Sequence, residues 1–147
     1  MTTEADSKEI ISELSDLIKL DYDAIAAYQS AIERLDDAGH KKKLAEFMGD
    51  HESHVQELGK AVRNHGGTPP TEGGALKVLT KGKVVIAGLV GDKAILKAMK
   101  ANEVVTNTKY EHAAKKNYPE QIQAIVQQGL SDERRHKDWI EATIERH

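Results

Sequence analysis

The sequence repeats itself at a spacing of 82 positions, and this repeat restricts the fold of the chain more than any other feature. Apolar positions agree in that register, including Leu14 with Leu96 and Leu58 with Ile140. Five polar positions agree as well, and three of those pairs are identical. The polar pairs are Asp21 with Glu103, Tyr28 with Tyr110, Asp50 with Asp132, His51 with Glu133, and His54 with His136. Two related units therefore account for most of the chain.

Within each unit, apolar side chains recur every third or fourth residue, which is the spacing of one face of an α-helix. The pattern predicts helices over residues 8–36 and 41–65, with a turn at Gly39 between them. Two further helices are expected to begin at Asp92 and Pro119. Asp92 is the expected N-cap of the third helix, and Pro119 suits the first turn of the fourth.

We expect one all-α domain over residues 1–147, an antiparallel four-helix bundle made of the hairpins 8–65 and 92–146. The crossover 66–91 between them contains the helix-breaking run GGTPPTEGG, and its segment 75–90 is expected to form a short helix. Composition agrees with this fold class. Aromatic residues make up only 4% of the chain, whereas a sheet would favour aromatic and β-branched side chains.

Composition also excludes several kinds of protein and site. With no cysteine, the chain has no disulfide, thiolate zinc site or iron–sulfur cluster, so any metal must bind histidines and carboxylates. The net charge of -3 disfavours nucleic acid as the main partner. No run approaches the ~20 apolar residues of a membrane span. The polar start MTTEADSKEI lacks the pattern of a signal peptide, so we expect a cytoplasmic protein.

Six ionisable residues interrupt the apolar stripes of the four helices. In each hairpin, the first of them is 30 residues from the second, so that the chain runs along one helix and returns to the same level on the next. Packing the hairpins face to face would bring all six together midway along the bundle. They are Asp21, His51, His54, Glu103, Glu133 and His136.

Buried ionised side chains need compensation, because each costs several kcal/mol in a protein core when it lacks a partner. A metal centre would provide that compensation, since carboxylates and imidazoles supply the ligands that iron, manganese and zinc accept. Glu133 and His136, one helical turn apart, would serve one site. A buried network of ion pairs without a metal is the alternative interpretation.

The repeat also predicts the residues that support the six. A histidine that binds a metal usually donates its other ring N–H to a carboxylate. Asp132 is expected to accept from His54 across the bundle, and Asp50 from His136. Two tyrosines lie two turns beyond the carboxylates of the first and third helices, and each would donate a hydrogen bond to a ligand, act as a redox-active phenol, or be an ordinary core residue. They are Tyr28 and Tyr110.

The run Asp132-Glu133-Arg134-Arg135-His136 matches the Asp-Glu-x-Arg-His motif of ferritin-like di-iron proteins such as bacterioferritins and rubrerythrins. Glu103 matches the carboxylate that those proteins carry on the preceding helix. Over nearly its whole length, the chain resembles a bacterial ferritin-like four-helix-bundle family of unknown function, in its GGTPP loop and in GDKAILKAMKANEVVTNTKYEHA. The resemblance implies a di-metal centre holding two iron ions, with manganese or zinc as alternatives.

The first half departs from the ferritin pattern. Asp21 stands where those proteins have Glu, and His51-x-x-His54 stands where they have Glu-x-x-His. Three carboxylates would leave two divalent ions with a charge of +1, so a site for a single metal is an open alternative. By the resemblance, Asp21 and His54 form one subsite with His51 as a further candidate ligand, Glu103 and His136 form the other, and Glu133 is the evident bridge.

These observations favour an intracellular metal-binding protein that reacts with oxygen or peroxide, as a di-iron oxidase or peroxidase would. The alternative is a non-catalytic, stress-associated or scaffold bundle whose site is structural, vestigial or occupied by one zinc or iron ion. Nucleic acid is not an expected partner. A homodimer is compatible with a bundle of this size, but no apolar stripe demands one.

Overall fold

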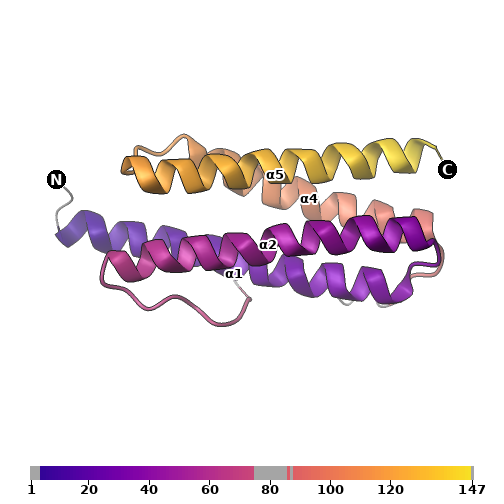
Figure 1. Ribbon diagram of the computed structural model, residues 1–147, viewed down its shortest axis with the longest axis horizontal. Helices are drawn as coiled ribbons and strands as arrows, with labels where there is room; N and C mark the ends of the chain where they lie inside the picture. The colour runs from indigo at the N-terminus through magenta and orange to yellow at the C-terminus, as the bar shows by residue number, and fades with distance from the viewer. Residues whose placement is uncertain (1–3, 75–85, 87, 147) are drawn as a thin grey trace.

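The structure, a computed structural model, describes residues 4–74, 86 and 88–146, and the chain forms an all-α antiparallel four-helix bundle as the sequence predicts (Figure 1). Over the described ranges there is no β-strand. No helix among them is both long and apolar enough to cross a membrane. The helices are α1 (Glu4–Arg34), α2 (Ala38–Asn64), α4 (Asp92–Ala114) and α5 (Glu120–Glu145).

The two hairpins are α1 with α2 and α4 with α5, and they pack through α1 against α4 and α2 against α5. The carboxylate of Asp92, at the start of α4, accepts hydrogen bonds from the backbone N–H groups of Asp36 (2.8 Å) and Asp37 (3.1 Å). The start of α4 therefore lies at the turn between α1 and α2, at the opposite end of the bundle from the end of α2. This arrangement makes the hairpins antiparallel to one another across both contacts.

Three local predictions need correction. Gly91 is the N-cap of α4, because the carboxylate of Asp92 is engaged by the other hairpin. Gly39 lies inside the first turn of α2, since Asp37 caps that helix by accepting from the N–H of His40 (2.9 Å). Pro119 precedes α5 as its N-cap instead of lying in its first turn. Most of the expected helix over 75–90 lies outside the described residues.

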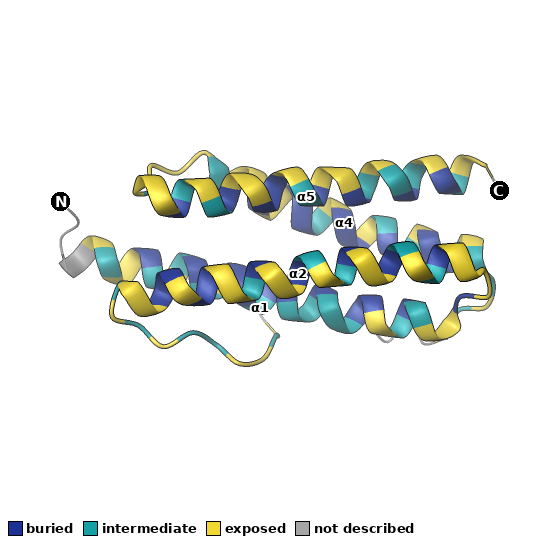
Figure 2. Cartoon of the chain, viewed as in Figure 1, coloured by how far each residue is buried: buried dark blue, intermediate teal, exposed yellow. Residues whose placement is uncertain are grey.

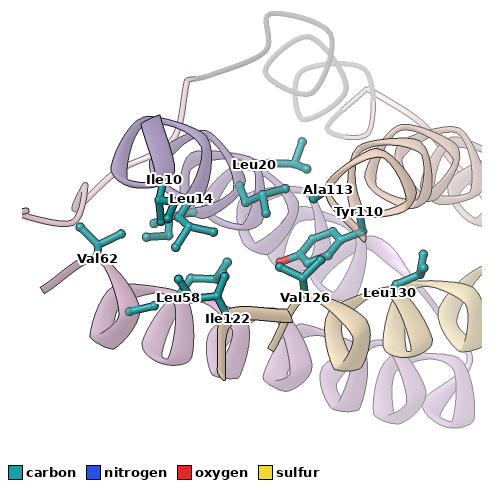
Figure 3. Packing of buried hydrophobic residues seen from close by; sticks show 13 residues of the cluster. Ile10, Leu14, Leu20, Leu58, Val62, Tyr110, Ala113, Ile122, Val126 and Leu130 are labelled. Carbon is teal, nitrogen blue, oxygen red and sulfur yellow. The ribbon is translucent and has the colours of Figure 1, made fainter. Parts of the chain in front are cut away.

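Two apolar clusters fill the interior, one toward each end of the bundle, and the buried faces of the helices follow the predicted stripes (Figure 2). The first contains Leu14, Leu58 and Tyr110, and Figure 3 shows how its side chains meet between the helices. The second contains Tyr28, Phe47 and Ile140. Each tyrosine of the repeat therefore belongs to a different cluster, and the polar residues between the clusters lie near the middle of the bundle.

Candidate metal centre

All six predicted residues are buried between the two apolar clusters. Their helical spacing determines this placement, because each one occupies a stripe position that would otherwise carry an apolar side chain. Six ligand-type residues from four helices are thus brought to one place, with Asp21 from α1, His51 and His54 from α2, Glu103 from α4, and Glu133 and His136 from α5.

The six residues form two overlapping groups, in each of which four ligand atoms lie within 4.8 Å of one another. We call these groups the Asp21 subsite and the Glu103 subsite. The two groups share His51 and Glu133, which lie between them. The Asp21 subsite consists of Asp21, His51, His54 and Glu133, and the Glu103 subsite consists of His51, Glu103, Glu133 and His136.

In the Asp21 subsite, both histidines of α2 converge on one carboxylate oxygen. Nδ1 of His51 lies 2.8 Å and Nδ1 of His54 lies 3.1 Å from Oδ1 of Asp21. Oε1 of Glu133 lies 3.4 Å from Nδ1 of His51 and 3.6 Å from Nδ1 of His54. Two nitrogens and two oxygens therefore face a common centre, which is a donor set that iron, manganese or zinc accepts.

The Glu103 subsite is more open in its atomic spacing. Nδ1 of His136 lies 3.5 Å from Oε1 of Glu103 and 3.8 Å from Oε2 of Glu133. Nε2 of His51 lies 3.5 Å from the same oxygen of Glu103. His51 thus faces this subsite with its second ring nitrogen, a role that the sequence interpretation, which considered it only for the Asp21 subsite, did not include.

The two tyrosines reach across the bundle to the carboxylate of the opposite hairpin. The hydroxyl of Tyr28 donates to Oε1 of Glu103, and the hydroxyl of Tyr110 donates to Oδ2 of Asp21 (2.6 Å). Both tyrosines are buried, and burial followed by the nearby carboxylate charges raises the pKa of each phenol well above its usual value. As neutral phenols, they orient the two carboxylates through these hydrogen bonds.

The outer nitrogens of two histidines meet carboxylates from the opposite hairpin, in the pairing that the repeat predicts. Nε2 of His54 lies 2.9 Å from Oδ2 of Asp132, and Nε2 of His136 lies 2.8 Å from Oδ2 of Asp50. Arg135 donates to both of these aspartates, at 2.7 Å to Asp50 and 3.0 Å to Asp132. Such contacts place the Nδ1 atoms of the two histidines toward the interior of the centre.

Two residues of α4 that were not identified as part of the site also hold it together. Oγ1 of Thr106 donates to Oε2 of Glu133 at 2.7 Å, and Nδ2 of Asn107 donates to the backbone oxygens of Glu103 (2.7 Å) and Glu133 (3.0 Å). Their positions three and four residues after Glu103 place them on its face of the helix, and that spacing is the signal by which they could have been found.

Aromatic rings cover the two subsites differently. The ring of Phe47 stacks on His136, with centroids 4.3 Å apart. The repeat puts Gly129 at the position equivalent to Phe47, and the ring beside His54 is that of Tyr110, with centroids 5.4 Å apart. A surface pocket of about 330 Å³ is lined by His54 and Asp132 together with Gln128 and neighbouring residues of α2 and α5. The Asp21 subsite therefore lies closer to the surface than the Glu103 subsite.

Without a metal, the surroundings favour protons in the cluster. Burial alone would lower the pKa of His51, but the charge of Glu133, the hydrogen bond with Asp21 and the nearby carboxylate of Glu103 outweigh it and raise that pKa to about 10. Burial is likewise outweighed at His54, where Asp132 and Asp21 raise the pKa to about 9. Burial and the charge of Glu103 hold the pKa of Glu133 well above its usual range. The centre thus attracts positive charge.

Three buried atoms of the described cluster have no hydrogen-bond partner. They are Nε2 of His51, Oε1 of Glu133 and Nδ1 of His136. A buried polar atom without a partner is unfavourable by about 1–3 kcal/mol, so such atoms call for an explanation. Each is a metal-ligand atom that faces the other members of its subsite, and the residues present therefore fit the metal ions that the resemblance implies.

Comparisons with known proteins agree with this fold. The family described as "Domain of unknown function (DUF2383)" matches residues 9–116, and a search of curated proteins finds no significant match. A dodecameric thioferritin, the bacterioferritin-related protein from Bacteroides fragilis, is 15% identical with a TM-score of 0.76, over 93% of this chain and 84% of that one. A ferritin-like diiron-carboxylate protein from Bacillus anthracis str. Ames is 19% identical with a TM-score of 0.73, over 98% of this chain and 99% of that one. At these identities, the likeness establishes a ferritin-like fold.

Proposed function

Because this chain belongs to the DUF2383 family, whose description assigns no activity, its function must be argued from the centre itself, and we propose that the bundle binds two metal ions, in the first instance iron. One ion would bind in the Asp21 subsite and the other in the Glu103 subsite. Support comes from the donor set of three carboxylates and three histidines and from the two solved ferritin-like proteins, one of them described as diiron-carboxylate.

The single observation that carries the proposal is the set of three unpartnered ligand atoms in a fully buried cluster. An ion-pair network would be expected to satisfy its own members, since a partly satisfied buried network is less stable than an apolar core. Nε2 of His51 and Nδ1 of His136 instead face carboxylate oxygens at 3.5 Å, which is beyond a good hydrogen bond. A cation between such atoms would satisfy them together.

Two ferrous ions would supply two electrons for the reduction of oxygen or of a peroxide. The residues of the chain have three tasks in that reaction. The phenols of Tyr28 and Tyr110 hold the two carboxylates in place, Asp50 and Asp132 orient the histidines, and the apolar clusters on either side keep bulk water out. An oxidase or peroxidase-type activity is the finer form of the proposal.

An anaerobic titration of metal-stripped protein with ferrous iron tests the proposal directly. We expect two ions per chain before air is admitted, and near-ultraviolet ferric absorption afterwards. Two ions without that absorption would support metal binding and contradict the reaction with oxygen. One ion would reduce the centre to a mononuclear site, and no bound ion would overturn the proposal in favour of the buried ion-pair network.

Replacement of Glu133 is the most informative companion experiment, because this residue belongs to both subsites. Glu133→Ala should abolish binding of both ions, and Glu133→Gln, which keeps the side-chain volume, should do the same while circular dichroism shows an intact fold. Glu52→Ala removes an exposed carboxylate from α2 and serves as the control that should bind like the wild type. Full occupancy in both Glu133 variants would contradict the shared site.

A structural zinc site is the second candidate function, because His51 replaces the carboxylate expected at one bridging position and makes the donor set richer in nitrogen. The ferrous-loaded protein separates the two candidates, because zinc is expected to bind more tightly than ferrous iron in either case. If the site is structural, zinc should raise the unfolding temperature, and the ferrous-loaded protein should gain no ferric absorption in air.

A further inference from the structure

The two residues shared by the subsites occupy equivalent positions of the internal repeat. His51 in α2 and Glu133 in α5 are related by the spacing of 82 that also relates Asp21 to Glu103 and His54 to His136. Exchanging the hairpins therefore exchanges the two subsites while leaving the pair in the middle. A residue at position 51 is placed by this symmetry to face both subsites, as Glu133 does.

The ring of His51 meets this requirement with its two nitrogens. Nδ1 lies 2.8 Å from Oδ1 of Asp21, and Nε2 lies 3.5 Å from Oε1 of Glu103, so the nitrogens face different subsites. Glu133 divides its oxygens in the same way, with Oε1 at 3.6 Å from Nδ1 of His54 and Oε2 at 3.8 Å from Nδ1 of His136. Each shared residue offers one ligand atom to each subsite.

We propose that His51 is a bridging ligand that binds one ion through Nδ1 in the Asp21 subsite and a second ion through Nε2 in the Glu103 subsite. This inference rests on the proposed function, since it assigns the bridge of that same centre. Both nitrogens donate a lone pair, so the ring gives up its N–H protons to solvent as the ions bind. Electrons are not transferred in this step.

Charge supports the bridge. Asp21, Glu103 and Glu133 carry three negative charges when ionised, which leaves two divalent ions with an excess of one positive charge in a buried centre. An uncompensated buried charge is strongly unfavourable. Deprotonated at both nitrogens, His51 supplies the fourth negative charge, and the centre becomes neutral without a ligand from outside the chain.

The bridge differs from a carboxylate bridge in the separation that it sets between the ions. Metal–nitrogen bonds of about 2.0–2.1 Å on opposite sides of the ring hold the ions roughly 6 Å apart. Carboxylate-bridged pairs in two-metal sites lie about 3.5–4 Å apart. At the longer separation, Glu133 would bind one ion through each of its oxygens.

Three alanine variants distinguish a shared ligand from one that serves a single subsite. Calorimetric titration with Co²⁺, which does not react with air as ferrous iron does, measures each binding step. His54→Ala should weaken one step, His136→Ala the other, and His51→Ala both. Each loss should be at least ~10-fold, because losing only the supporting partner of a ligand already weakens metal binding by about 10–100-fold. His51→Gln, which keeps most of the side-chain volume, should repeat the loss of both steps if the alanine variant folds poorly.

The variant His51→Glu supplies the matched control for the bridge. It gives α2 the same Glu-x-x-His sequence that α5 has in Glu133 and His136, so both bridging positions become carboxylates. X-ray absorption or anomalous diffraction of the Co²⁺-loaded proteins should give an ion separation near 6 Å in the wild type and about 3.5–4 Å in the variant. Rescue of both binding steps is expected as well.

The outcomes separate this inference from the proposal on which it rests. Wild-type protein that binds no Co²⁺ and no ferrous iron would overturn both. Two bound ions with equal separations in the wild type and in His51→Glu would overturn the bridge alone. The same holds if His51→Ala weakens only the step that His54→Ala weakens, because His51 would then serve the Asp21 subsite only.

Discussion

The two hairpins share one register, and two of the pairs of equivalent positions at which they differ bear directly on the centre. At the first pair, α2 has His51 where α5 has Glu133, and at the second, α2 has Phe47 where α5 has Gly129. Both differences lie in or beside the centre. The pair His51 and Glu133 changes which atoms face the interior of the centre, whereas the pair Phe47 and Gly129 changes what covers it.

The aromatic difference shows how the bundle compensates for unequal volumes. A Cβ atom at position 129 would collide with the ring of Tyr110, so only glycine lets that ring approach α5. As a result, the Tyr110 ring lies 5.4 Å from His54, while the Tyr28 ring, held off by Phe47, lies 6.2 Å from His136. Phe47 of the first hairpin therefore covers His136. Tyr110 of the second hairpin, which lies close to α5, covers His54.

The largest effect that would sharpen this comparison is expected at alkaline pH in the metal-free protein. Two histidines of the first hairpin, His51 and His54, have pKa values raised from 6.5 to about 10 and about 9. A group whose pKa is raised by folding stabilises fully below its unfolded pKa, and that stabilisation is lost as the pH rises through the folded value. The free energy of unfolding in chelator should therefore decline from pH 6.5 to pH 10.

Denaturant unfolding at a series of pH values checks this decline. With saturating Zn²⁺, the histidines bind as unprotonated ligands, so the decline should shrink and ion binding should tighten as the pH rises over the same window. A flat profile in chelator would contradict the raised pKa values of His51 and His54.

The next largest effect is expected when Phe47 and Gly129 are each replaced by alanine. Phe47→Ala opens a cavity over His136 and should lower the free energy of unfolding by about 3–5 kcal/mol. Gly129→Ala adds a methyl group against Tyr110 and should lower it by about 1–3 kcal/mol. Chemical denaturation measures both effects. Helix propensity alone would make Gly129→Ala more stable than the wild type. That result would contradict the close contact between position 129 and Tyr110.

A smaller difference is expected between the tyrosines. Tyr28→Phe removes a hydrogen bond to the ionised Glu103 and should lower the free energy of unfolding in chelator by about 1.5–3 kcal/mol. Tyr110→Phe should have less effect, because its carboxylate partner, Asp21, also has His51 and His54 within 3.1 Å. Equal losses in the two variants would show that the histidines do not support Asp21.

The smallest of these effects concerns the outer carboxylates. Asp132→Asn should weaken ion binding in the Asp21 subsite and Asp50→Asn should weaken it in the Glu103 subsite, each about 10–100-fold, because the partner of a ligating histidine is altered. Titration with Co²⁺ resolves the two steps, and Asp138→Asn, at an exposed position of α5, is the control. If both variants weakened the same step, the pairing of His54 with Asp132 and of His136 with Asp50 would be contradicted.

Much of the centre could be predicted because it depends on register alone. The pairs His54 with Asp132 and His136 with Asp50 follow from the repeat, since equal spacing along packed helices fixes which residues reach the same level. The face-to-face packing of the hairpins follows from the same stripes. No side-chain rotamer had to be known for either inference.

The features that were missed depend on side-chain direction or on distant backbone. The two-sided position of His51 is a matter of ring orientation, which spacing along the sequence does not determine. Asp92 has the pattern of an N-cap, yet its carboxylate accepts from the N–H groups of Asp36 and Asp37, which are remote in sequence. A local pattern identifies a capping residue without revealing which backbone it caps.

The hydrogen bonds of Tyr28, Tyr110, His54 and His136 to their carboxylates all cross from one hairpin to the other, and each subsite takes one of its four ligands from the opposite hairpin. Neither hairpin alone can assemble a complete subsite. The connection between α2 and α4 then acts as a tether that sets the effective concentration of one hairpin for the other. Two copies of the chain that exchanged hairpins would rebuild both centres with the same contacts, which makes this fold well suited to domain swapping.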